Sequence, residues 1–441
     1  MIKALAGSFS KVVKRWLPDA FLFAVILTFV VFLFGIIFKG QSPVDMVNFW
    51  GKGFWKLLAF AMQMVLVLVT GHTLAKTKVV ESILKSISGL AHNPSQAIIV
   101  TTLVALIACW INWGFGLIVG ALLAKQMAKR IKGIHYGLLV ASAYSGFLVW
   151  HAGLSGSIPL KVAQVSKNFM SEITGGEIIP VAETIFAWQN LLICVVLMIT
   201  LPIINMMMAP DAGDIVEIDP SLLEENAGEE TKTPGTTPAE KFENSVIISM
   251  LLGLFGFSYI VYYFVNGGKL GLNSVNMIFL FAGIVLHGTP ANFLKAANEA
   301  IKNTGGIVLQ FPLYAGIMGM MVHSGLASSI SQWFVQVSTP MTFPFFTFLS
   351  AGIVNFFVPS GGGQWAVQGP IIMPAAKALG VPLGKAAMAI AWGDAWTNMI
   401  QPFWALPLLG IAGLGIRDIM GYCVVALLWG GFLISLVLMF L

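Results

Sequence analysis

The stretch Asn355-Phe-Phe-Val-Pro-Ser-Gly-Gly-Gly-Gln-Trp365 interrupts an apolar run in the second half of the 441-residue chain. A similar stretch, Asn112-Trp-Gly-Phe-Gly116, interrupts the first half. His151 follows Asn112 by 39 positions, and Asp394 follows Asn355 by 39 positions. Inside a bilayer, backbone can leave the helix only where protein or a water-filled cavity satisfies its N–H and C=O groups. The matched breaks therefore predict a buried polar site, and their duplication is typical of transporters.

The composition predicts a membrane protein. Hydrophobic residues make up 57% of the chain and charged residues only 10%, against roughly 25% charged residues in an ordinary soluble domain. Residues 21–38 form an uncharged run of eighteen, close to the roughly 20 that cross a bilayer core. Because no small-residue cleavage site follows this run, we expect an uncleaved first span rather than a signal peptide.

The charges are distributed unevenly along the chain. Ten of the nineteen acidic residues lie between positions 211 and 243, and the rest of the chain has 22 basic and 9 acidic residues. We interpret residues 211–243 as an acidic, partly disordered cytoplasmic linker. The basic excess is scattered over many loops, which favours membrane topology over nucleic-acid binding. The three cysteines lie far apart in apolar stretches and indicate neither a disulfide framework nor a metal site.

Basic clusters predict how the apolar segments cross the membrane. Lysines at positions 76–85 precede residues 96–123, and basic residues at positions 125–132 follow them. If both clusters are cytoplasmic, residues 96–123 enter and leave by one face as a re-entrant hairpin, with two half-length helices of roughly 20 Å each. Residues 324–340 carry no charge, which places them outside. Residues 343–378 are therefore predicted to form a second hairpin that enters from the opposite face. The result is about nine full spans, a cytoplasmic N-terminus and an external C-terminus.

The order of segments predicts an inverted repeat. A shift of 251 positions lays His72 on His323, and a shift of 243 lays Asn112 on Asn355. We expect an all-α polytopic membrane protein in which residues 1–210 form the first repeat and residues 211–243 the linker. Residues 244–441 then contain a connecting span at 245–265 and the second repeat.

The hairpin tips are candidates for substrate binding, because free N–H groups at a helix N-terminus attract anions. Glycines at the tips would let a ligand approach the backbone, although they also serve as helix caps and close helix contacts. Polar residues before the prolines of the following broken spans would complete the cavity, although such residues can simply bond neighbouring helices. The candidates are Asn112, Gly114, Gly116, Ser155, Ser157, Asn355, Ser360, Gly361, Gly362, Gly363, Gln364, Asn398 and Gln401.

Two titratable residues are candidates for the coupling cation. Asp394 is the one acid that this topology places deep in the second half, and a carboxylate inside a membrane is costly unless it functions. It could exchange a proton or coordinate Na⁺; the alternatives are a structural pair with a lysine such as Lys385 or a position closer to the membrane interface. Its counterpart His151 could titrate near an anion, but a satisfied core histidine is the commoner case, and no essential chemistry is expected of it.

Several motifs are absent from the sequence. It contains no GxxxxGK[ST] phosphate loop, so any pumping must use an ion gradient, and no HExxH or paired-histidine motif, so a metalloenzyme is disfavoured. We therefore expect a non-enzyme without cofactors, coupled to H⁺ or Na⁺, with Na⁺ near Asp394 as the sole metal considered. A passive anion channel and a membrane-embedded enzyme remain the alternatives.

Five longer strings resemble the bacterial short-chain fatty acid transporter family over almost the whole chain. They are Trp16-Leu-Pro-Asp19, Ile111-Asn-Trp-Gly-Phe-Gly-Leu117, Val358-Pro-Ser-Gly-Gly-Gly-Gln-Trp365, Gln401-Pro-Phe-Trp-Ala-Leu-Pro407 and Gly415-Ile-Arg-Asp-Ile-Met-Gly-Tyr-Cys423. The resemblance implies uptake of small monocarboxylates such as acetoacetate or butyrate across the bacterial inner membrane, and we expect cation-coupled symport as its mechanism. The family is similar to the wider ion-transporter superfamily, which implies an elevator motion of paired hairpins and allows a homodimer.

Overall fold

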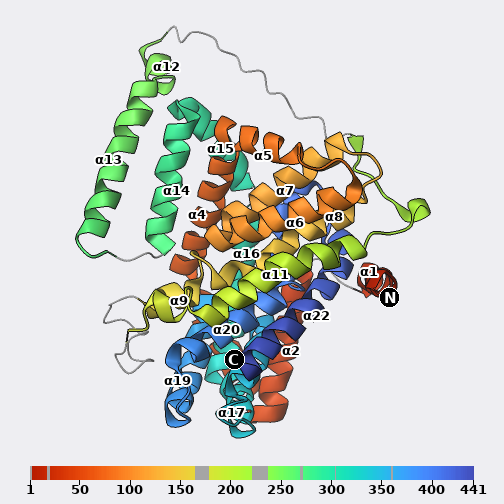
Figure 1. The fold of residues 1–441 in the computed structure, drawn as a ribbon. Helices are drawn as coiled ribbons and strands as arrows, with labels where there is room; N and C mark the ends of the chain where they lie inside the picture. Colours follow the sequence, from red (N-terminus) through yellow and green to blue (C-terminus); the bar gives the residue numbers. More distant parts are fainter. Residues whose placement is uncertain are drawn as a thin grey trace.

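The computed structural model describes residues 2–16, 20–163, 178–220, 237–268, 272–302, 304–358 and 361–441. All regular structure in these ranges is helical, and they contain no strand. The helices pack into one body from which α13 stands apart at the edge (Figure 1). The all-α prediction is confirmed.

The first half contains an N-terminal helix, nine further helices and two short 3-10 helices among the described residues. They are α1 (Ile2–Trp16), α2 (Ala20–Lys39), α3 (Pro43–Phe54), α4 (Leu58–Ala75), α5 (Lys78–Ser88), α6 (Pro94–Ile111), α7 (Trp113–Arg130), α8 (Tyr136–Ser145), η1 (Gly146–Ala152), α9 (Ser157–Val162), η2 (Val181–Glu183) and α11 (Trp188–Met207).

The linker and the second half continue the same helical pattern. Their elements are η3 (Ala212–Asp214), α12 (Pro238–Glu243), α13 (Val246–Val265), α14 (Leu272–His287), α15 (Pro290–Lys302), α16 (Gly305–His323), α17 (Leu326–Gln336), α18 (Phe343–Phe357), α19 (Gly361–Ala378), α20 (Leu383–Asn398), α21 (Pro402–Ala412) and α22 (Ile416–Phe440).

The two halves make reciprocal contacts. Helices α2 and α3 of the first half pack on α16 of the second, and α14 and α15 of the second half pack on α4 of the first. Within the halves, α5 contacts α7 as α17 contacts α19, and α6 contacts α8 and η1 as α18 contacts α20. Two copies of one unit, related by an internal two-fold axis, would make this pattern of contacts.

The first hairpin is longer than the sequence predicts. Asn93 caps α6, Pro94 is its first residue, and α7 continues to Arg130, so each arm has 18 residues. At 1.5 Å per residue each arm is about 27 Å long, rather than the predicted roughly 20 Å. The apolar run is shorter than the hairpin because the capped start of α6 and the basic last turn of α7 are helical but polar.

The remaining breaks match the prediction closely. Helices α18 and α19 lie within residues 343–378, the range predicted for the second hairpin. The span that contains His151 changes to a 3-10 helix at Gly146 and leaves the helix after Ala152, and the span that contains Asp394 leaves it after Asn398 and resumes at Pro402. Each half thus has a hairpin followed by a broken helix.

Length and composition identify six membrane-crossing candidates in the described ranges. They are Phe21–Lys39, Pro94–Ile111, Tyr136–Val162, Trp188–Met207, Val246–Val265 and Ile416–Phe440, and the bent pair Val308–His323 and Leu326–Gln336 would make a seventh. Five of the nine predicted full spans are among these six. The other four predicted spans are shorter, bent or broken. The sixth candidate is α6, an arm of the first hairpin that is by itself long and apolar enough to cross a membrane. The count of nine and the re-entrant character of the hairpins stay predictions.

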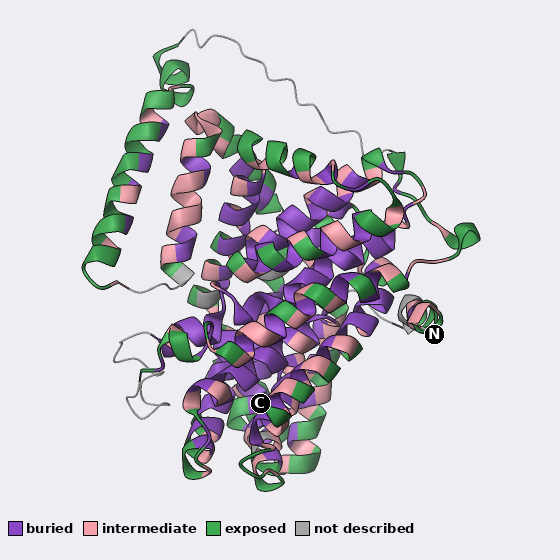
Figure 2. Cartoon of the chain, in the orientation of Figure 1, coloured by how far each residue is buried: buried purple, intermediate pink, exposed green. Residues whose placement is uncertain are grey.

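Burial separates the centre of the molecule from an apolar rim. Helices α7, α8 and α20 are mostly buried, whereas α2 and α13 expose large apolar side chains, such as Phe29 (64% exposed) and Phe255 (76% exposed) (Figure 2). Extended exposed apolar surface is what a membrane-facing helix presents. Helix α13, the extra span of the sequence analysis, packs chiefly on α14.

The described start of the acidic linker is attached to the first half. Asp211 pairs with Lys3 of α1, and the Tyr136 N–H donates to the Val216 carbonyl over 2.8 Å. Residues 221–236, on which most of the predicted disorder falls, lie outside the described ranges.

Candidate functional site

At the first break, Asn112 ends one helix and begins the next. Its Oδ1 accepts the Phe115 N–H over 2.9 Å, and the Trp113 N–H donates to Ser155 Oγ over 2.9 Å. A Cβ on Gly116 would lie 2.4 Å from the Cys109 nitrogen, and one on Gly114 would lie 2.7 Å from the Val67 carbonyl oxygen. These two glycines therefore allow close helix packing, the alternative role named for them above.

At the second break, Asn355 ties α18 to α20. Its Nδ2 donates to the Asp394 carbonyl and to Thr397 Oγ1, both over 2.9 Å, and its own carbonyl accepts from Gln401 Nε2 over 2.6 Å. In α19, Gln364 Nε2 donates to the Ala351 carbonyl over 2.7 Å. Asn355 and Gln401 thus hold the second hairpin against the broken helix α20–α21, and Gln364 joins the two arms of the hairpin.

The two breaks meet at a pair formed by the equivalent residues His151 and Asp394. His151 Nδ1 lies 3.0 Å from Asp394 Oδ2, and both side chains are fully buried. The two atoms are within hydrogen-bonding distance, but the angle departs from that of a hydrogen bond. The pair joins the first half to the second, so Asp394 pairs with His151 and not with Lys385, which the sequence analysis named as its structural alternative.

Hydrogen bonds determine which ring nitrogen of His151 carries the proton. The Ile158 N–H points at Nε2 over 3.0 Å, and Ser157 Oγ lies 3.0 Å from the same atom. A backbone N–H can only donate, so Nε2 is the unprotonated acceptor and the Ser157 hydroxyl donates to it. The neutral ring then carries its proton on Nδ1, the atom that faces Asp394.

The orientation of Asn398 shows that the second oxygen of the Asp394 carboxylate, Oδ1, accepts a hydrogen bond. The Trp150 indole N–H donates to Asn398 Oδ1 over 2.9 Å, and because an indole only donates, the amide is oriented with Nδ2 toward Asp394. Asn398 Nδ2 donates to Asp394 Oδ1 over 3.1 Å and lies 3.3 Å from Gln401 Oε1. Asp394 Oδ1 is therefore an acceptor, and Oδ2 is the oxygen left open.

Three buried oxygens at this junction have no aligned donor among the described residues. They are Asp394 Oδ2, Asn355 Oδ1 and Gln364 Oε1. A buried acceptor without a donor is costly, at about 1–3 kcal/mol each. The arrangement can accept a cation or a proton-bearing group. The described residues contain no group of three or more His, Cys, Asp or Glu side chains that could hold a metal ion.

The N-terminal end of α19 lies directly against the first-half residues. A Cβ on Gly361 would lie 2.2 Å from Ser157 Oγ and 2.5 Å from His151 Cε1. Gly361, Gly362 and Gly363 make up the first turn of this helix, whose dipole favours negative charge. Ser360, another candidate, lies outside the described ranges.

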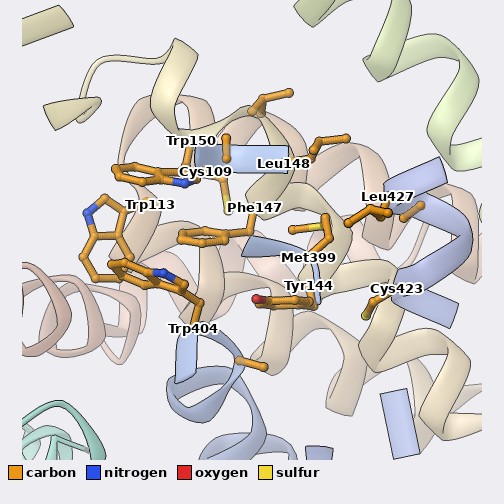
Figure 3. Packing of buried hydrophobic residues seen from close by; sticks show 14 of the residues in the cluster. Cys109, Trp113, Tyr144, Phe147, Leu148, Trp150, Met399, Trp404, Cys423 and Leu427 are labelled. Carbon is orange, nitrogen blue, oxygen red and sulfur yellow. The ribbon is translucent and has the colours of Figure 1, made fainter. Parts of the chain in front are cut away.

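An aromatic cluster supports the histidine. Trp150 stacks on the His151 ring with centroids 4.1 Å apart and planes 14° apart. Figure 3 shows Trp150 together with Phe147, Trp113 and Trp404, which come from both halves. The sequence analysis did not identify these aromatic residues, because tryptophan in an apolar run is usually packing. Their spacing within the runs contains no signal that could have distinguished them.

Asn190 of α11 is a further connection that the sequence analysis missed. Its Oδ1 accepts the Trp392 indole N–H over 3.0 Å, and its Nδ2 donates to the Ala152 carbonyl over 3.0 Å and to the Ile185 carbonyl over 2.8 Å. It thus links the residue after His151 to the helix that carries Asp394. An asparagine in the first turn of an apolar helix was the available signal.

Replacing Asn190 is expected to destabilise the protein. Asn190→Leu leaves the Trp392 indole and the carbonyls of Ala152 and Ile185 without this partner, and each unsatisfied buried group costs about 1–3 kcal/mol. Thermal unfolding in detergent should show a clearly lower midpoint than wild type. Gln189→Leu on the same helix is the matched control, and equal midpoints for the two variants would contradict this role.

Sequence comparison matches a family model and two named relatives over almost the whole chain. The model of the family described as "Short chain fatty acid transporter" matches residues 1–441. A protein of Escherichia coli (strain K12) named "Putative short-chain fatty acid transporter" is 47% identical over 442 residues, covering 99% of this chain and 100% of that protein. A protein of the same name from Haemophilus influenzae is 47% identical over 435 residues, covering 97% of both.

A solved structure shares the fold. The chain is similar to the YdaH transporter of Alcanivorax borkumensis, whose crystal structure is described as revealing an unusual topology. The TM-score is 0.50 with 15% sequence identity, and the match covers 96% of this chain and 97% of that one. At this identity the likeness concerns the fold alone.

Proposed function

Since this chain belongs to the short chain fatty acid transporter family, we propose that it carries small monocarboxylates, such as acetoacetate or butyrate, by cation-coupled symport. The chain is a membrane transporter rather than an enzyme, in line with the names of its relatives. The bacterial inner membrane is its proposed location, with the N-terminus in the cytoplasm and the C-terminus outside.

The contact between His151 and Asp394 is the observation that carries the proposal. It places two titratable side chains, fully buried and 3.0 Å apart, where the broken helices of both halves meet. Buried ionisable groups inside a membrane are retained where they serve an ion or substrate pathway. A site made equally by two repeats is where transporters of duplicated architecture bind their substrates.

The ends of the broken helices suggest separate positions for the two ligands. Helices α18 and α20 end at the junction, and the C-terminal end of a half-helix favours a cation. We assign the coupling ion, H⁺ or Na⁺, to the open oxygens of Asp394 and Asn355. The first turn of α19 begins at Gly361 beside Ser157 and would hold the substrate carboxylate. Asn112, Ser155, Gln364, Asn398 and Gln401 would then orient these groups.

An elevator motion of an inverted repeat is the proposed mode of transport. The contacts of α2 and α3 with α16, matched by those of α14 and α15 with α4, support two related units. In this scheme the hairpins α6–α7 and α18–α19 enter from opposite faces and move with the helices that carry His151 and Asp394. The remaining helices would form the scaffold, with a second copy of the chain as a potential partner in a homodimer.

Uptake into proteoliposomes tests the function. We expect protein-dependent uptake of labelled acetate, butyrate and acetoacetate, driven by a pH gradient or by a Na⁺ gradient when each is imposed alone. Protein-free vesicles are the control, because the uncharged acid crosses a bilayer unaided far more readily than its anion. Uptake that never exceeds this control for any short acid would refute the proposal.

A further inference from the structure

A cavity of about 370 Å³ lies beside the buried junction, between the start of α11, the start of α20 and the end of α22. Its size falls within the range of sites for small ligands. We call it the outer vestibule; its lining is Ala182, Glu183, Phe186, Ala187, Trp188, Gln189, Asn190, Ile193, Pro382, Gly384, Lys385, Met388, Trp392 and Leu438. The charge-based topology places all three of these helix ends on the exterior, so the vestibule would open to the outside.

Two residues of the vestibule wall are connected to the segments that carry His151 and Asp394. Asn190 and Trp392 line the cavity and are joined by the indole hydrogen bond of 3.0 Å. Asn190 also bonds to the carbonyl of Ala152, the residue after His151, and Trp392 lies two residues before Asp394. These links connect the wall of the vestibule to the segments that carry both members of the pair.

The charges of the lining suit an anion with a short apolar tail. Lys385 is half-buried in the wall, and no ion pair joins it to any residue in the described part of the chain. Phe186, Met388 and Ile193 provide apolar surface beside it. The one acid of the lining, Glu183, is exposed, so solvent and salt screen its repulsion of an anion more than they screen the attraction of the half-buried Lys385.

We propose that the outer vestibule is a first binding site for the substrate, reached from outside before the buried junction. Lys385 binds the carboxylate, the apolar wall takes the short hydrocarbon tail, and the Asn190–Trp392 wall separates this site from His151 and Asp394. The inference rests on the proposed function, because it concerns the route of the same substrate. A lipid phosphate could also bind Lys385, and the experiment below distinguishes the two sources of negative charge.

The test measures the concentration dependence of butyrate uptake in right-side-out vesicles containing wild type, Lys385→Met, Lys385→Arg and Glu183→Gln. Loss of the lysine charge should raise KM about three- to ten-fold with an unchanged maximal rate, as removal of a steering charge does. Lys385→Arg keeps the positive charge and should therefore have the wild-type KM. Glu183→Gln should lower KM, a sign reversal that a purely structural role would not produce. Efflux from the same vesicles should keep its wild-type KM.

The outcomes separate the vestibule from the function it serves. If wild type takes up butyrate and all variants share its KM, the vestibule proposal is wrong while the transport function stands. A Lys385→Met effect that occurs only in vesicles rich in anionic lipid would assign the lysine to a lipid headgroup and overturn the proposal. If wild type takes up no short acid at all, the proposed function fails and the vestibule proposal fails with it.

Discussion

Asp394→Asn is expected to abolish gradient-driven uptake of butyrate. The substitution keeps the side-chain volume and the oxygen that accepts from Asn398, but it removes the charge that faces His151 Nδ1 over 3.0 Å. Because the open oxygen of Asp394 is the proposed position of the coupling ion, the initial rate should fall to that of protein-free vesicles. The measurement is initial uptake into proteoliposomes with a pH gradient or a Na⁺ gradient imposed.

A second carboxylate provides the control for Asp394→Asn. Asp214 is exposed at the start of the acidic linker, far in sequence from either break, and Asp214→Asn should keep the wild-type rate. Both variants should elute as wild type does from a sizing column, which separates lost coupling from lost folding. Accumulation of substrate against its gradient by the Asp394→Asn protein would remove Asp394 from the coupling site.

Gly361→Ala is the second substitution with a large expected effect. The new methyl group would lie 2.2 Å from Ser157 Oγ and 2.5 Å from His151 Cε1, so it would push the first turn of α19 away from the first half. Overpacking of this kind costs about 1–3 kcal/mol, and the same groups form the proposed carboxylate position. We expect butyrate uptake to fall about ten-fold or more.

The matched control for this variant is another helical glycine. A Cβ on Gly51 of α3 meets no atom within 4 Å, so Gly51→Ala should transport as wild type does. Thermal unfolding of both variants shows how much of the effect is stability. A Gly361→Ala protein with wild-type uptake would mean that this contact between the halves has no part in substrate binding.

The sequence predicted the breaks of the chain better than the lengths of its helices. Asn112 and Pro402 mark helix boundaries where they were expected, because capping side chains and proline act locally. The first hairpin extends to Pro94 and Arg130 because the ends of a helix can be polar, and hydropathy does not register them.

The pairing at the candidate site depended on tertiary structure. The equal spacing of His151 after Asn112 and of Asp394 after Asn355 identified both residues, but it could not show that they face each other. Their contact follows from the packing of η1 on α20, which no local pattern encodes. The sequence analysis therefore assigned His151 no essential chemistry and considered Lys385 as a partner for Asp394, whereas the structure joins the two counterparts.

The roles of Asn190 and Trp150 could not be predicted from the sequence either, because they too depend on tertiary packing. Asn190 and Trp150 act through partners about 200 or more positions away in the chain, Trp392 and Asn398 respectively. An isolated asparagine or tryptophan in an apolar run has many ordinary packing roles. Only the packed helices show which of these residues bond across the junction of the two halves.

Substrate counterflow tests the central claim most directly, because it needs a carrier site that faces each side in turn. Proteoliposomes loaded with unlabelled butyrate at equal pH inside and outside are diluted into a trace of labelled butyrate. If the protein is such a carrier, label in wild-type vesicles rises above its equilibrium level and then declines, and Gly361→Ala vesicles show far less of this overshoot. A steady approach to equilibrium in wild type, without any overshoot, would contradict the account and favour a passive channel.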